Sequence, residues 1–172
     1  REGAWETWNF PRLTMSSWPS EPDATMRQDS AVNDIYLERM SGQTAHLRLH
    51  VNGVLLVERL VCDGIIASTA LGSTAYHFSA SGHACHPQVS AIHLTPICPH
   101  APRLTPITLP ETSVIEVEVI DADKRPVRVV SDGVDHGPVQ RVAVQTDPRG
   151  VNLAFLEGHD FTATLVRKIL MT

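Results

Sequence analysis

Positive charge is scarce in this sequence and nowhere concentrated. The 172 residues include 14 Lys and Arg against 19 Asp and Glu, which gives a formal net charge of −5. Binding to a nucleic-acid backbone depends on clustered positive charge, so we expect no nucleic-acid partner. Aromatic residues make up only 5% of the chain. We interpret the tryptophans as packing or edge-covering residues rather than a stacking platform (Trp5, Trp8 and Trp18).

Long apolar runs and a secretory signal are also missing. No stretch approaches the roughly 18 apolar residues that a membrane-spanning helix needs, so we expect no membrane association. The first segment, REGAWETWNF, lacks the charged-then-apolar order of a signal peptide. It also lacks an initiating Met, which indicates a fragment or a processed product. Three cysteines without a signal peptide favour reduced thiols and a cytoplasmic protein (Cys62, Cys85 and Cys98).

Short segments of alternating apolar and polar residues dominate the rest. AHLRLHV places Leu47, Leu49 and Val51 on one face, and Asn52-Gly53 predicts a tight hairpin turn into VLLVERLV. The later segments VIEVEVI, VRVV, RVAVQT and VNLAFLEGHDFTATLVRKIL are also strand-like. Several short strands at regular spacing predict one all-β domain, a sandwich or a barrel, over residues 1–172. Residues 1–30 form its lead-in, with a loop over 18–30.

One segment departs from this pattern. STAYHFSASGHAC predicts a short helix of about two turns, with Ser73 or Thr74 as its cap and Gly82 at its end.

The stretch DGIIASTALGSTAY, residues 63–76, carries the first chemical signal. A buried strand that opens into a capped helix exposes backbone N–H groups, and hydroxyls beside them suit a ribose or a phosphate. Ordinary helix capping is the more common explanation of the same residues. Asp63, the first residue of the stretch, directly precedes its apolar and hydroxyl-rich part and could present a carboxylate to a ribose. His136, on the loop SDGVDHG, is a candidate for a phosphate contact.

Histidines and cysteines raise the alternative of a zinc site. The candidate ligands are His83, Cys85, His86, Cys98 and His100. Their spacing matches no standard zinc finger or ribbon, so we predict no metal site in this chain.

Three segments together resemble the NAD kinase family. AVNDIYLERM is similar to its Asn-Glu segment, and DGIIASTALGSTAYHFSASG to its Asp-Gly…Gly-Ser-Thr-Ala-Tyr stretch. LTPICPHAPRLTPITLP resembles the Thr-Pro-Ile-Cys-Pro-His segment that follows. The segments occur in the family's order over residues 31–135. The resemblance implies the family's C-terminal, NAD-binding domain, an all-β, two-sheet β-sandwich with one or two short helices.

The resemblance also implies roles for individual residues. Asn33 and Asp34 would hold the adenosine part of NAD, with Asp34 in place of the family's usual Glu. Asp63 would face a nucleotide across a subunit boundary, because these enzymes assemble as homodimers or homotetramers. The remaining pocket residues would be Thr74, Ala75, Tyr76 and Ser79.

The family's Gly-Gly-Asp-Gly motif is absent from the chain, so the resemblance implies no catalytic residue here. That motif would lie on an upstream α/β domain. Joined to it, the protein would convert ATP and NAD into ADP and NADP with Mg²⁺ or Mn²⁺, whereas this segment alone would be inactive.

The chain departs from the family pattern at Ala70, Leu71, Thr105 and the segment SASG (79–82). These departures leave one alternative open, and the two-domain plan shared with a related superfamily leaves a second. One is a non-catalytic module for dinucleotide binding or oligomerisation. The other is the C-terminal domain of a lipid kinase of the same superfamily.

Overall fold

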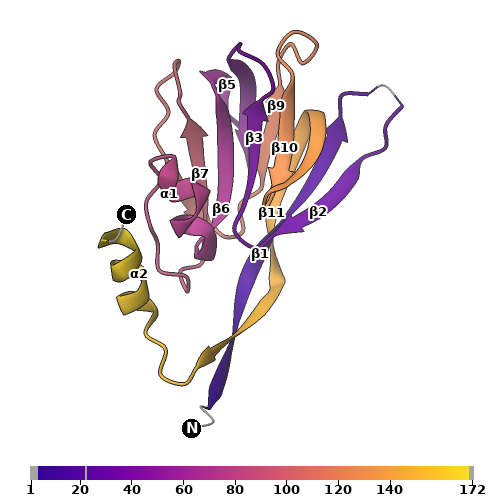
Figure 1. The fold of residues 1–172 in the computed structure, drawn as a ribbon. Helices are drawn as coiled ribbons and strands as arrows, with labels where there is room; N and C mark the ends of the chain where they lie inside the picture. The colour runs from indigo at the N-terminus through magenta and orange to yellow at the C-terminus, as the bar shows by residue number, and fades with distance from the viewer. Residues whose placement is uncertain (1–3, 22, 171–172) are drawn as a thin grey trace.

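The computed structural model describes residues 4–21 and 23–170, which fold into a strongly curled antiparallel sheet with three short helical segments (Figure 1). The strands are β1 (Trp5–Pro19), β2 (Arg27–Ala31), β3 (Asp34–Arg39), β4 (Ala45–Val51), β5 (Val54–Cys62), β6 (Gly64–Thr69), β7 (Ala91–Ile97), β8 (Ile107–Pro110), β9 (Ile115–Val119), β10 (Val127–Ser131) and β11 (Val134–Leu156). The helical segments are η1 (Leu71–Thr74), α1 (Tyr76–Ser79) and α2 (Phe161–Leu170).

The long strand β11 joins two layers. Its first residues pair with β10 in a sheet that continues through β3, β6 and β7 to β8. From Val139 onward it pairs with β1, and over Arg141–Val144 also with β9, in a second sheet that continues to β4 and β5. The expected two-sheet, all-β fold is therefore confirmed, with β11 shared by both sheets.

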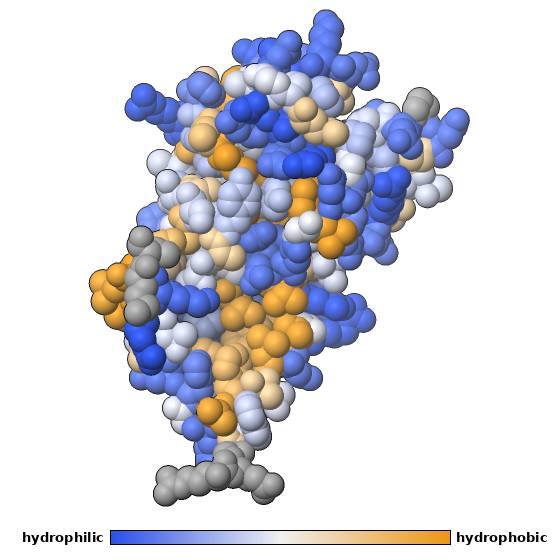
Figure 2. Space-filling view, in the orientation of Figure 1, coloured by the Kyte–Doolittle hydropathy of each residue, from blue (hydrophilic) through white to orange (hydrophobic). Residues whose placement is uncertain are grey.

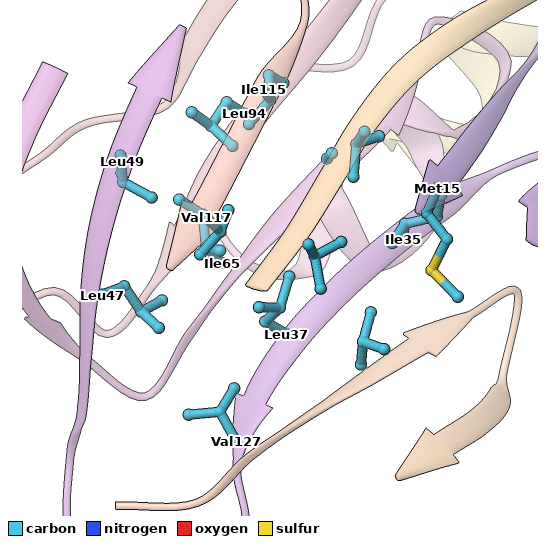
Figure 3. Close-up of a cluster of buried hydrophobic side chains, with 14 of the residues drawn as sticks. Met15, Ile35, Leu37, Leu47, Leu49, Ile65, Leu94, Ile115, Val117 and Val127 are labelled. Carbon is cyan, nitrogen blue, oxygen red and sulfur yellow. The ribbon is translucent and has the colours of Figure 1, made fainter. Parts of the chain in front are cut away.

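The core lies between the two layers. Leu47 and Leu49 of β4 are fully buried, as are Ile35 and Ile65 of the opposite sheet. Figure 3 shows such side chains from both layers pointing toward one another. Alternation places apolar side chains on one face of each strand, and their removal from water is the main stabilising contribution to the fold.

The Asn52-Gly53 turn between β4 and β5 is confirmed. Both residues have positive φ, 52° and 75°, as a two-residue turn between antiparallel strands requires. The Asn52 side-chain oxygen also accepts a hydrogen bond of 2.8 Å from the Val114 N–H.

The prediction of a strand at the C-terminal end of the chain is wrong, because residues 161–170 form α2. Asp160 caps this helix: its side-chain oxygen accepts the Ala163 N–H at 2.9 Å. Phe161 then packs edge-on against Trp8 and Phe155, with ring centroids 5.5 and 4.9 Å apart. An aspartate followed by apolar residues at helical spacing was the missed signal.

The loop predicted over residues 18–30 is too long. β1 continues to Pro19, and β2 begins at Arg27 and pairs with β1. The polar residues of β2 are compatible with a strand because β2 lies at a sheet edge and faces solvent.

Beyond the body of the sheet, β1 and the end of β11 form a two-stranded ribbon, with α2 folded back beside it (Figure 1). Apolar residues gather over the lower part of this face (Figure 2). Among the described residues, no helix has both the length and the apolar character needed to cross a membrane.

Candidate functional site

The candidate site is built where β6 ends and the chain turns into η1 and α1, beside the start of β3. We call residues 32–34, 68–76 and Asp132 the strand–helix junction. Thr69 closes it: its hydroxyl donates to the Val32 carbonyl at 2.8 Å and accepts the Gly72 N–H at 2.9 Å. Ser68 and Thr69 are both buried. These two hydroxyls therefore hold the backbone together and are not free to contact a ligand.

Gly72 lets the two segments approach closely. A Cβ atom at this position would lie 2.2 Å from the Asn33 carbonyl oxygen and 2.5 Å from the Asn33 Cα. Both of these are backbone atoms and cannot move aside cheaply. The glycine therefore fixes Asn33 directly against η1.

Asp132 is a junction residue that the sequence did not single out. It lies in the turn between β10 and β11, and its carboxylate accepts the N–H groups of Val32, Asn33 and Asp34. Three hydrogen bonds to one carboxylate hold this segment rigidly. The sequence signal was the pair Asp132-Gly133, which on its own indicates only a turn.

Asp34 is buried between these elements. Burial, together with the nearby Asp132 carboxylate, raises the pKa of Asp34 from 3.8 to about 6. The Tyr76 backbone N–H donates to Asp34 and opposes this shift. The prediction that Ser73 or Thr74 caps the helix is wrong, because neither side chain caps the helical turns. The Asp34 carboxylate instead accepts the N–H of Tyr76, the first residue of α1.

Tyr76 and Ser79 line an open cleft of about 430 Å³, which we call the Tyr76 cleft. The Tyr76 ring also packs edge-on against Tyr36, with centroids 5.0 Å apart. The other wall of the cleft is formed by Pro96, Ile97, Cys98, Pro99, Leu104, Thr105 and Pro106.

Thr74 lies on the other side of the helical turns. It lines a smaller cavity of about 120 Å³ beneath α2, together with Leu71. Its hydroxyl accepts a 3.2 Å hydrogen bond from the Lys168 ammonium. Two of the residues that depart from the family pattern therefore lie in different places. Leu71 lines the cavity beneath α2, whereas Thr105 lines the Tyr76 cleft.

Asp63 is not brought together with the other predicted site residues of the same chain. It precedes β6 and forms an ion pair of 2.7 Å with Arg39 at the end of β3. Asp34 begins β3, five residues earlier, which corresponds to roughly 17 Å along a strand.

His136 lies near the Asp132 turn, on β11. Its Nε2 atom is 2.7 Å from the Ser131 hydroxyl and 2.9 Å from the Asp29 carboxylate. His136 is therefore held by protein groups at the rim of the junction.

Two buried histidines, His77 of α1 and His93 of β7, lie against each other, and the sequence did not point to them. The rings of His77 and His93 are tilted, with centroids 4.9 Å apart. Burial lowers the pKa of His77 to about 4, so the ring is neutral at ordinary pH. Its two nitrogens contact the Thr95 hydroxyl and the His83 carbonyl. No three histidine, cysteine or acidic residues in the described part of the chain are placed to hold a metal ion.

The fold and the junction together define a β-domain with a polar strand-to-helix turn beside an open cleft. The family model for the ATP-NAD kinase C-terminal domain matches residues 32–153, which include the junction and the cleft. The chain therefore belongs to this family, and the resemblance inferred from the sequence is confirmed.

Individual relatives of the chain support the same family assignment. The NAD kinase of Cereibacter sphaeroides (strain ATCC 17029) is 38% identical over 140 residues, which are 80% of this chain and 55% of the relative. The NAD kinase of Hyphomonas neptunium is 34% identical over 148 residues, 85% of this chain and 58% of the relative. The chain thus spans little more than half the length of these relatives.

Two solved structures share the fold. The yeast NADH kinase complexed with NADH has a TM-score of 0.83 at 26% identity, covering 96% of this chain and 48% of that one. The NAD kinase of Archaeoglobus fulgidus in complex with ATP has a TM-score of 0.75 at 27% identity, covering 97% and 61%.

Proposed function

We propose that this chain is the NAD-binding part of an NAD kinase, which transfers a phosphoryl group from ATP to the 2′-hydroxyl of NAD. The observation that carries the proposal is the family match over residues 32–153, which includes Asn33, Asp34 and residues 74–76 of the strand–helix junction. The relatives are named NAD kinase, and one solved neighbour is described with NADH and another with ATP.

The junction supplies a rigid frame for the adenosine part of the dinucleotide. Asn33 is exposed while its backbone is fixed by Asp132 and η1, so its amide can bind a ligand at little entropic cost. Asp34 offers a carboxyl group whose raised pKa allows it to donate or accept a hydrogen bond near neutral pH. Ala75 connects these residues to the cleft.

The Tyr76 cleft supplies the wall of the pocket. The Tyr76 ring gives a flat apolar surface for a base or ribose, and Ser79 gives a hydroxyl at the same wall. Thr74 supports this wall from the α2 side. His136, at the rim of the junction, would contact a phosphate, in which case its hydrogen bond to Asp29 would be exchanged for one to the ligand.

Phosphoryl transfer requires both reactants in line and a metal that spreads the developing charge. The described residues offer no metal-binding cluster, so no step through Mg²⁺ or Mn²⁺ is assigned to this chain. The metal would enter with ATP, bound by an N-terminal α/β domain carrying the Gly-Gly-Asp-Gly motif. In this division, residues 1–172 orient the 2′-hydroxyl and exclude water from it.

The protein would act in the cytoplasm as a homodimer or homotetramer. Asp63 lies about five strand residues from Asp34 in its own chain, so it reaches a bound nucleotide most simply from a neighbouring subunit.

Calorimetry with NAD, NADP and ATP on the complete protein, beside a turnover assay for NADP, tests the proposal. We expect NAD and NADP to bind and NADP to form from NAD and ATP. Binding without turnover would instead indicate a non-catalytic dinucleotide module, and absence of binding would contradict both. Full turnover by residues 1–172 alone would refute the two-domain account.

A further inference from the structure

His77 anchors the single helical turn α1 to the rest of the fold. Its side chain is 1% exposed, whereas Tyr76 and Ser79 of the same turn line the Tyr76 cleft. Gly82 packs closely on the ring, because a Cβ atom there would lie 2.3 Å from the His77 Nε2 atom. A helical turn of four residues has little stability of its own. The contacts of the His77 ring therefore hold α1, and with it two of the predicted NAD contacts, in place.

The hydrogen bonds of His77 fit a neutral ring. Its Nε2 atom is 3.2 Å from the His83 carbonyl oxygen, which can only accept, so Nε2 carries the ring hydrogen. Its Nδ1 atom is 2.8 Å from the Thr95 hydroxyl and accepts the hydrogen of that hydroxyl. A second proton, added at Nδ1, would meet the hydroxyl hydrogen that now points at it. Thr95 would then have to turn its hydroxyl and lose this bond as a donor.

His93 makes a positive charge here still less favourable. It lies on β7, is 2% exposed, and its ring centroid is 4.9 Å from that of His77. Its Nδ1 atom is 3.0 Å from the Thr108 hydroxyl, while its Nε2 atom is buried and has no hydrogen-bond partner within the described residues. A protonated His93 has an N–H group at both nitrogens, so the one at Nε2 would be buried without an acceptor.

We propose that the His77–His93 pair is a proton-sensitive switch that positions α1 while both rings are neutral and releases it when one ring takes up a proton. His77 is then a positioning residue, which acts on NAD through Tyr76 and Ser79. In that respect the inference rests on the proposed function and gives its site a form of regulation. A released ring reaches water, where the charged imidazole is solvated.

The other titratable groups around α1 leave the pair without a counter-ion. His83 adds a further positive charge when protonated and so lowers the pKa of both rings. Asp34 accepts the Tyr76 N–H at the start of α1, and Lys168 donates to Thr74 beside it. No carboxylate in the described part of the chain contributes to the pKa of either buried ring.

The size and direction of the effect follow from proton linkage. Burial, together with His93, lowers the pKa of His77 from its ordinary 6.5 to about 4, so the released ring binds a proton more tightly than the buried one. α1 is held most firmly above about pH 6.5 and less firmly as the pH falls toward 4. Between pH 7.5 and pH 5 the equilibrium constant for release should rise about 30-fold.

Hydrogen exchange of the complete protein at pH 7.5 and pH 5, corrected for intrinsic exchange rates, measures this release. The Ala80 and Gly82 amides report it, because they donate to the Tyr76 and His77 carbonyls. We expect their protection to fall about 30-fold in the wild type and much less in His77→Phe, which keeps a ring that cannot be protonated. The matched control is His50→Phe on β4, which should keep the wild-type fall.

An equal fall in the wild type and in His77→Phe would overturn the proposal. Asp34 also titrates in this pH range, but it is present in all three proteins and cancels from their difference.

NMR titration of the wild-type ring tests the switch without a substitution. We expect the His77 ring of the folded protein to be neutral at pH 5, and the pKa of His77 to rise in His93→Phe, where the neighbouring ring can carry no charge. A His77 ring that is already protonated at pH 5 while buried would contradict the inference.

Added NAD separates this inference from the proposed function. NAD bound against Tyr76 and Ser79 should slow the exchange of α1 at pH 5, because it binds only the positioned form. If the effect of pH is present and NAD leaves exchange unchanged, the switch stands and the assignment of these two residues to NAD falls. If NAD slows exchange and His77→Phe shows the wild-type effect of pH, the assignment stands and the switch falls.

Discussion

The two ends of the β3–β6 pair carry the two groups of residues that the sequence linked to NAD, and they differ physically. At one end Asp34 lies opposite Ser68, buried and surrounded by backbone hydrogen bonds. At the other end Asp63 and Arg39 form an ion pair, both about one-third exposed. The comparison teaches that one end is a rigid, preorganised frame, whereas the other is a solvent-accessible surface that a partner can reach.

The largest change in stability is expected from a substitution that tests how tightly the buried end is packed. Gly72→Ala places a Cβ against the Asn33 backbone and should lower the free energy of unfolding by about 3 kcal/mol. Urea denaturation measures it. Gly42→Ala is the control, because nothing lies within 4 Å of its Cβ. Equal stability of the two variants would show that the junction can relax.

The second prediction concerns the charge of Asp34. Its pKa in the fold, about 6, lies above its ordinary 3.8, so the folded state binds the proton more tightly than the unfolded state. The stabilisation is complete below about pH 4 and is lost as the pH rises through about 6, a fall of about 2–3 kcal/mol. Unfolding of wild type against Asp34→Asn at several pH values measures the difference. A difference that does not change with pH would contradict the raised pKa.

The third prediction addresses Asp132, which joins the two chain segments at the buried end. Asp132→Asn should cost about 2 kcal/mol, because a neutral amide accepts the three backbone N–H groups less well than a carboxylate. It should also lower the pKa of Asp34 by removing a neighbouring negative charge. NMR titration of Asp34 and urea unfolding test both parts. Asp123→Asn, on an exposed turn, should change neither.

The smallest effect is expected at the exposed end. Arg39→Met breaks the ion pair with Asp63, but exposed pairs contribute little, so we expect a loss of about 0.5 kcal/mol. Added salt should shrink the difference further. Thermal unfolding at low and high ionic strength measures it. A loss as large as that of Gly72→Ala would mean that the two ends do not differ as described.

Whether a sequence prediction succeeded depends on how far apart along the chain the interacting residues lie. The strands around Leu47 and Leu49 and the Asn52-Gly53 turn were predicted because alternation and turn chemistry act between near neighbours. α2 was missed because its apolar residues also fit a strand, and its cap, Asp160, was not considered. Lys168 and Thr74, 94 positions apart, could not be connected without the helix.

The sequence by itself determined the β class and the family, because these depend on local pattern and on motif order, whereas its residues for a nucleotide site stay a prediction. Only the tertiary structure placed Asp132 against Asn33 and Asp34, since those contacts join positions about a hundred residues apart once the sheet has curled. The burial that follows raises the pKa of Asp34. The length of β3 separates Asp34, at its first residue, from Asp63, which pairs with Arg39 at its last.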